Sequence, residues 1–162
     1  MITAGVITLR DKGSRGERVD LSGPEVTRML KEIGIETTCY EVVPDEADVI
    51  EKKLIELVDN RRLDLVVTTG GTGVSPRDVT PDATLKVIDR EIPGMAEAMR
   101  RESMLKTPHA MISRAVAGIR KTTLIINLPG SPKGVRENLA VILPALKHAI
   151  EKIKGDQSDC AS

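Results

Sequence analysis

The sequence predicts an α/β fold, a three-layer α/β/α sandwich with a mostly parallel central sheet. Apolar runs typical of strands alternate along the chain with segments of helical period. Of the 162 residues 40% are hydrophobic, yet the chain has one Tyr and neither Phe nor Trp. The core must therefore be aliphatic, and many of its residues are β-branched, as in parallel strands that are buried on both faces. We expect residues 1–154 to form a single domain of ordinary length and residues 155–162 to form a frayed tail.

Five apolar runs are the predicted strands, and the last two form a pair: 2–9, 35–43, 63–68, 113–119 and 122–128. The run Leu124-Ile125-Ile126 is fully apolar, which favours a central strand. The predicted helices lie between the strands, over 22–33, 46–58, 80–105 and 132–153. The third of them is interrupted at Pro93-Gly94, and Pro144 should kink or break the fourth.

Three helix starts carry capping signals. Ser22 is followed three residues later by Glu25, which matches a capping box. Thr80 precedes a proline and then Asp82, which is expected to be an acid that complements the helix dipole. Ser131 also precedes a proline. These signals predict that each hydroxyl side chain caps its own helix.

Composition excludes several classes of function. The 24 basic residues balance 24 acidic ones, so a wide basic surface for nucleic acid or anionic lipid is not expected. No apolar stretch approaches the ~20 residues that cross a bilayer, and no secretory leader is recognisable. Cys39 and Cys160 form no disulfide framework or metal spacing, which favours a reducing cytoplasm. Only Tyr40 could stack on a base.

In a parallel sheet, ligands bind beyond the carboxyl ends of the strands, so the loops there are the candidate site. The loop T-T-G-G-T-G-V-S-P-R-D-V-T-P-D spans 68–82 and has three glycines in four residues. Glycines let backbone N–H groups approach an anion, which favours phosphate or nucleotide binding over a merely tight turn. The loop is neither a P-loop nor a dinucleotide fingerprint. Arg77 is either a phosphate ligand or a solvated charge.

Three acids follow strands, namely Asp11, Asp45 and Asp78. Carboxylates that converge on phosphates indicate Mg²⁺, which takes one or two carboxylates, phosphate oxygens and waters. Two alternatives remain open, because Asp45 could instead cap the helix that follows it and Asp78 could support the turn before Thr80.

A second candidate loop, N-L-P-G-S-P-K-G, spans 127–134 and joins an apolar strand to a helix. The N–H groups at the helix start could hold an anion, with Lys133 adding a charge. The alternative is a cap at Ser131 beside a surface lysine. His109 and His148 have no partner at ligand or triad spacing and are expected to be structural or on the surface.

Five strings occur in a fixed order along the chain: D-x-S-G-P at 20–24, V-V-P-D-E at 42–46, T-T-G-G-T-G-V-S-P-R-D-V-T-P-D-A-T from 68, I-P-G-M-A-E-A-M-R from 92, and N-L-P-G-S-P-K from 127. Together they resemble the molybdopterin adenylyltransferases, the MogA/MoaB family of molybdenum cofactor biosynthesis. The resemblance covers roughly residues 2–154 and implies that the single domain over 1–154 binds molybdopterin.

The resemblance implies a nucleotidyltransferase that moves AMP from Mg-ATP to the terminal phosphate of molybdopterin and releases pyrophosphate. It also implies a homotrimer that hands its product to a molybdate-insertion protein. The implied catalytic and metal-binding residues are Asp45 and Asp78. The implied ligand-binding residues are Gly70, Gly71, Thr72, Gly73, Ser75, Arg77, Pro129, Gly130, Ser131, Lys133, Asp11 and Lys12.

One string departs from the resemblance. Family members often carry Ser-Asp-Arg after the first strand, whereas this chain reads Arg10-Asp11-Lys12. The acid and a basic residue are kept, but Arg10 replaces the serine, so it could supply an anion contact in place of the serine's hydrogen bond. The alternative function is a MoaB-type or CinA-related protein that binds molybdopterin or a nucleotide without adenylyl transfer, as a carrier or scaffold.

Overall fold

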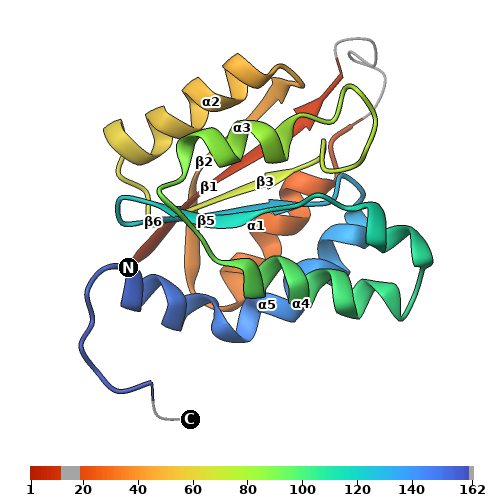
Figure 1. Ribbon diagram of the computed structural model, residues 1–162. Coiled ribbons are helices and arrows are strands. Elements are labelled where there is room, and N and C mark those ends of the chain that lie inside the picture. Colours follow the sequence, from red (N-terminus) through yellow and green to blue (C-terminus); the bar gives the residue numbers. More distant parts are fainter. Residues whose placement is uncertain (12–18, 161–162) are drawn as a thin grey trace.

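The computed structural model describes residues 1–11 and 19–160, and within these residues one six-stranded sheet runs through the molecule (Figure 1). The sheet order is β2-β1-β3-β6-β5-β4. Neighbours among β1, β2, β3 and β6 pair in parallel, whereas β5 runs antiparallel to both β6 and β4. The strands are β1 (Ile2–Arg10), β2 (Ile35–Pro44), β3 (Leu65–Thr69), β4 (Arg90–Glu91), β5 (Ala117–Arg120) and β6 (Thr123–Leu128). The predicted α/β class with a mostly parallel sheet is confirmed.

Helices cover both faces of the sheet, as Figure 1 shows. Helices α1, α4 and α5 lie below the sheet in that view, and α2 and α3 lie above it. The π-helix η2 continues α2, and the short 3₁₀ helix η3 follows α4. Their bounds are α1 (Ser22–Glu32), α2 (Ala47–Ile55), η2 (Glu56–Asn60), α3 (Thr80–Val87), α4 (Pro93–Met104), η3 (Pro108–Ile112) and α5 (Pro132–Ile153).

The two faces carry separate aliphatic cores, and β6 contributes to both. Leu124 and Ile126 pack in the cluster that contains α1 and α5, and Ile125 packs in the cluster that contains α2 and α3. All three are fully buried, each with an expected gain of about 1.5–3 kcal/mol from removing its side chain from water. The prediction that this apolar run is a central strand is therefore confirmed.

Helix α1 begins at the predicted residue, but the predicted capping box is wrong. The residue at the cap position is Leu21, which cannot cap with its side chain, and the Ser22 hydroxyl donates to the Gly130 carbonyl at 2.6 Å. The Asp20 carboxylate takes over this role and accepts from the Ser22 and Gly23 N–H groups at 3.0 and 3.2 Å. Burial raises the pKa of Asp20, but hydrogen bonds from Tyr40 and others outweigh burial and leave the pKa lowered.

Three other boundaries differ from the prediction. The predicted third helix is broken before Pro93-Gly94: α3 ends at Val87, Arg90 and Glu91 pair with β5 as the short strand β4, and α4 begins at Pro93. The strand predicted over 113–119 begins only at Ala117. Helix α5 runs unbroken through Pro144, because Ile142 and Leu146 bury its apolar face on both sides of the proline. Within the described residues, we find no helix with the length and hydropathy needed to cross a bilayer.

An ion cluster joins η2 to the β5–β6 turn, far from the loops discussed below. The Arg120 guanidinium donates to both carboxylate oxygens of Asp59, at 3.0 and 2.8 Å, and Lys121 lies 3.2 Å from Asp59 Oδ1. The hydrogen bond from Arg120 leads the causes that lower the pKa of Asp59 to about 2.

A pH-dependent stability follows from this cluster. An Asp whose pKa falls on folding stabilises the protein above its unfolded pKa of about 3.9, and loses that effect as the pH falls towards 2. We expect Asp59→Asn to be less stable than the wild type at pH 7, with a difference that shrinks between pH 5 and pH 3. Urea unfolding at several pH values measures this. A difference that stays constant with pH would contradict it.

Candidate active site

The carboxyl ends of the four parallel strands meet at one edge of the sheet, as predicted. Arg10 lies beside Pro44, and Thr69 lies beside Leu128. The loops that follow are linked directly: the Gly70 N–H donates to the Leu128 carbonyl at 3.0 Å, and the Thr69 hydroxyl donates to the carbonyl of the next residue, Pro129, at 2.6 Å. The glycine-rich loop and the loop before α5 therefore form one continuous surface.

The two candidate carboxylates lie against the glycine-rich loop. A Cβ on Gly71 would lie 3.0 Å from Asp45 Oδ1 and would overlap the Thr80 hydroxyl. A Cβ on Gly73 would lie 2.8 Å from Asp78 Oδ2. The pKa of Asp45 is raised by burial and, second, by the negative charge of Asp78. The structure thus brings together the two acids that the sequence singled out.

The alternative role of Asp45 as a helix cap is not supported. Helix α2 begins at Ala47 after Glu46, and no side chain caps it there. Asp45 Oδ1 is buried and has no hydrogen-bond partner. A buried carboxylate oxygen without a donor, beside a second carboxylate, fits a divalent cation. Within the described part of the chain no group of three or more His, Cys, Asp or Glu is placed to hold a metal ion. Mg²⁺ commonly completes its ligands with phosphate oxygens and water.

Asp78 supports its turn as well as facing the loop. Its Oδ2 accepts from the Ser75 N–H at 3.0 Å, and the Ser75 hydroxyl accepts from the Arg77 N–H at 3.3 Å. The alternative prediction, that Asp78 supports the turn, is therefore confirmed for its Oδ2 atom. The turn holds this carboxylate in place beside Gly73, so the two roles are compatible.

The loop after β1 contributes Asp11, which forms an ion pair with Arg77. This pair joins the β1 loop to the glycine-rich loop. The Arg77 side chain is 71% exposed, and an exposed pair contributes little to stability, so Arg77 can exchange this partner for an anion. Lys12, the other candidate in this loop, lies outside the described residues.

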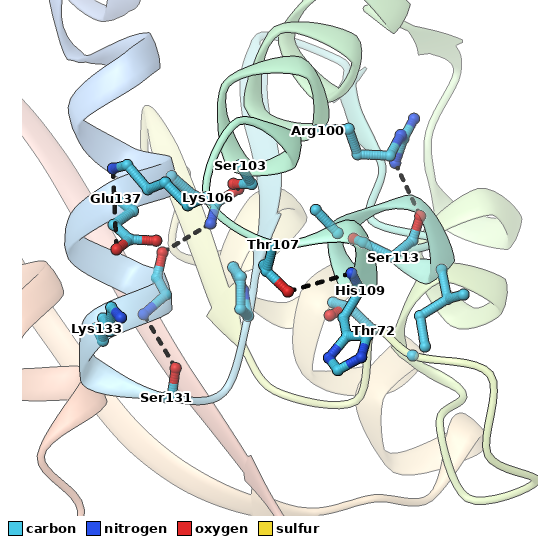
Figure 2. Close-up of a pocket in the computed structure, with 16 residues that line it drawn as sticks. Thr72, Arg100, Ser103, Lys106, Thr107, His109, Ser113, Ser131, Lys133 and Glu137 are labelled. Atoms are coloured by element: carbon cyan, nitrogen blue, oxygen red, sulfur yellow. Dashed lines mark hydrogen bonds and ion pairs between the residues drawn. The ribbon is translucent and has the colours of Figure 1, made fainter.

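A cavity of about 370 Å³ opens on the α4 and α5 side of the same loops (Figure 2). The glycine-rich loop supplies Thr72 and Gly73 to its wall, while α4, η3 and α5 supply most of the rest. Its charged or titratable lining residues are Arg100, Lys106, His109, Lys133 and Glu137. Glu137 lies 3.8 Å from Lys106, which leaves the cavity with an excess of positive charge. The wall therefore favours an anionic ligand.

The model of a family described as a probable molybdopterin binding domain matches residues 5–148. The chain belongs to this family. It is 46% identical over 157 residues to a protein of Helicobacter pylori named molybdopterin adenylyltransferase, covering 96% of this chain and 89% of that protein. The protein of the same name from Escherichia coli K12 is 47% identical over 139 residues, covering 83% of this chain and 70% of the relative. The resemblance drawn from the five strings is confirmed.

Solved structures agree with this membership. The molybdopterin biosynthesis enzyme MoaB of Thermus thermophilus superimposes with a TM-score of 0.88 at 49% identity, covering 96% of this chain and 98% of that one. The Mog protein of Mycobacterium ulcerans also gives 0.88, at 38% identity, covering 94% and 99%. A CinA protein of Thermoplasma acidophilum gives 0.63 at 21% identity, covering 91% and 97%, which shows a shared fold alone.

In this molybdopterin-binding-domain protein the loop before α5 is both a cap and part of the cavity. The Ser131 hydroxyl accepts from the Gly134 N–H at 3.0 Å, so the predicted cap is confirmed. Ser131 and Lys133 also line the cavity, as Figure 2 shows. His109, expected to be structural or on the surface, is an exposed residue of the same wall.

Sequence reasoning missed Arg114, which holds the glycine-rich loop. Its guanidinium donates to the Gly73 carbonyl at 2.8 Å and the Asp78 carbonyl at 2.6 Å, and it binds both Asp82 oxygens at 3.1 and 3.0 Å. Its own N–H donates to the Thr72 carbonyl at 2.7 Å. Asp82 is therefore an ion-pair partner, not only the dipole acid that was predicted. The sequence feature that could have indicated this role is the presence of a charged residue within the apolar run over 113–119.

We expect Arg114→Met to loosen the glycine-rich loop while both cores stay packed, because the carbonyls it binds belong to the loop. Hydrogen exchange of the Ser75, Arg77 and Asp78 amides, which are hydrogen-bonded within the loop, should become about tenfold faster or more, since a bond to a charged group contributes about 1.5–3 kcal/mol. Arg77→Met is the matched control, because Arg77 makes an exposed pair in the same loop. Equal exchange in Arg114→Met and wild type would contradict this role.

Proposed function

We propose that this protein transfers AMP from ATP to the terminal phosphate of molybdopterin and releases pyrophosphate, as a step of molybdenum cofactor biosynthesis. The observation that carries the proposal is the position of the Asp45–Asp78 pair. The pair lies against one glycine-rich loop, which also forms part of the wall of a cationic cavity. Relatives at 46–47% identity that are named molybdopterin adenylyltransferase support the same reaction.

The cavity is the proposed place for molybdopterin. Its volume of about 370 Å³ suits a small organic ligand, and Lys133 lies where the loop before α5 meets it. Lys133, with Arg100 and Lys106, would bind the terminal phosphate. The lining contains no Tyr, Phe or Trp within the residues described, so the pterin ring would be held by aliphatic walls and backbone groups.

The glycine-rich loop is the proposed place for the ATP phosphates. The Gly70 N–H already donates to the Leu128 carbonyl. The backbone N–H groups that remain to bind phosphate are therefore those of residues 71–73. Asp45 and Asp78 would hold Mg²⁺, and the unpartnered Oδ1 of Asp45 fits this role. When bound, Mg²⁺ offsets the charge that builds on the leaving pyrophosphate.

Apart from holding the metal, the residues of the site would mainly position the two substrates. The attacking terminal phosphate of molybdopterin is already ionised at neutral pH, so the site needs no strong general base. The loops place two anionic substrates beside each other, and their backbone N–H groups and lysines neutralise the charge that would keep them apart. Arg77, once it leaves Asp11, can add to this neutralisation.

Pyrophosphate release in the presence of ATP, Mg²⁺ and molybdopterin tests the proposal. Release that requires molybdopterin supports it. Binding of molybdopterin without release would favour the alternative of a MoaB-type or CinA-related carrier. Release from ATP without molybdopterin would point to a different nucleotide-handling enzyme.

We also propose that the protein is a cytoplasmic homotrimer that passes its product to a molybdate-insertion protein. The end of α4 and η3 expose four large apolar side chains close in sequence, which is typical of an interface: Met104, Leu105, Met111 and Ile112. Light scattering of Leu105→Asp should show a smaller species than the wild type. Leu85→Asp, at an exposed position on α3, is the matched control.

A further inference from the structure

Thr80, the first residue of α3, carries a buried hydroxyl that the hydrogen bonds of the fold leave unpaired. The residue is fully buried, and its Oγ1 has no hydrogen-bond partner. Its N–H donates to the Gly71 carbonyl at 3.2 Å, and its carbonyl accepts from the Thr84 hydroxyl at 2.8 Å. The backbone of Thr80 is therefore fixed, and the position of its side chain follows from it.

The predicted capping role does not account for this hydroxyl. The residue before α3 is Val79, and no side chain caps the helix there. A buried hydroxyl without a partner costs folding free energy, and such groups in native proteins call for an explanation such as a bound ion or water.

The neighbours of Thr80 indicate a ligand. Gly71 lies directly against the Thr80 hydroxyl and also against Asp45 Oδ1, the second buried oxygen without a partner in this region. Asp78 is close enough to Asp45 for its charge to raise the pKa of that residue. One neutral oxygen and two carboxylates thus gather at one turn of the loop.

We infer that Thr80 Oγ1 is a third protein oxygen of a divalent-cation site whose other protein ligands are Asp45 and Asp78. The inference rests on the proposed function, which places a cation at the two carboxylates. Mg²⁺ and Mn²⁺ accept hydroxyl oxygens beside carboxylates, as in phosphate-binding sites where a Ser or Thr binds the metal. A neutral third ligand suits this site, because a third carboxylate would repel the phosphates.

Mn²⁺ binding, followed by loss of the free-ion electron paramagnetic resonance signal, tests the inference. The protein is titrated with Mn²⁺ in the presence of α,β-methylene-ATP, which cannot release pyrophosphate, and the signal lost to the nucleotide alone is subtracted with a protein-free titration. We expect Thr80→Val to weaken Mn²⁺ affinity about tenfold or more, and Thr80→Ser, which keeps the oxygen, to stay close to wild type. Unchanged affinity in Thr80→Val, or no Mn²⁺ binding by the wild type, would overturn the inference.

Thr37→Val is the matched control. Thr37 also has a buried Oγ1 without a partner, but it lies on β2 opposite Ala4, towards the amino end of the strand. Its replacement should leave Mn²⁺ affinity unchanged, and a loss equal to that of Thr80→Val would overturn the inference.

Thermal unfolding in a chelator separates a metal role from a structural one. Thr80→Val should be at least as stable as the wild type there, because it removes a hydroxyl with no partner. If the valine were unstable for steric reasons, Thr80→Ala against Thr80→Ser gives the same comparison of Mn²⁺ affinity. Mn²⁺ binding is measured without molybdopterin and without turnover. If the wild-type protein failed to transfer AMP, the comparison of Mn²⁺ affinities would still test the role of Thr80.

Discussion

Asp78→Asn is expected to lower the rate of AMP transfer at least about 100-fold, the scale seen when one preorganised electrostatic group is removed from an active site. The change removes one charge from the pair that faces the glycine-rich loop. The Asn amide oxygen can still accept from the Ser75 N–H, which Asp78 Oδ2 binds at 3.0 Å. The turn should therefore survive, and the loss should fall on the chemical step.

Asp82→Asn is the control for this prediction. Asp82 is also an acid beside the loop, but it is bound by Arg114 and contacts neither Gly71 nor Gly73 closely. We expect it to retain most of the activity. Single-turnover pyrophosphate release with equal loading of molybdopterin measures both variants. Transfer by Asp78→Asn at a rate near that of wild type would remove Asp78 from the mechanism.

The sequence predicted the site best where strand ends determine it. Asp45, the loop from Gly70 and the loop to Lys133 each follow a parallel strand, and parallel strands in register bring their carboxyl ends to one edge. The same rule could not reveal the cavity, because its other wall comes from α4 and η3. Helix α4 packs against α5 and η3 packs against α4, so their positions depend on tertiary packing rather than on a local pattern.

The sequence failed where a side chain prefers a distant partner to a local one. Ser22 carries a capping signal, yet its hydroxyl donates to a carbonyl 108 residues away. Arg114 reaches Gly73 across 41 residues. A cap contributes only about 1 kcal/mol, so tertiary hydrogen bonds of similar or greater strength can override it. Such partners become visible only when the chain is folded.

Gly71→Ala is expected to remove AMP transfer almost completely and to lower the melting temperature. Gly71 has a φ of +68°, which costs a non-glycine residue about 1–2 kcal/mol. The added Cβ would also overlap the Thr80 hydroxyl and lie 3.0 Å from Asp45 Oδ1. The loop can relieve this overlap only by moving away from the carboxylate pair, and that movement displaces the amides of residues 71–73 from the phosphates.

Gly94→Ala separates this local effect from a general intolerance of alanine. Gly94 lies exposed in the first turn of α4, with nothing within 4 Å of an added Cβ. Alanine there should leave transfer unchanged and keep or raise stability, since alanine favours a helix by up to about 1 kcal/mol. Differential scanning calorimetry and pyrophosphate release measure both variants. If Gly71→Ala kept wild-type transfer, the close approach of Gly71 to Asp45 and Thr80 would have no part in catalysis, because the loop could shift away from both residues without loss.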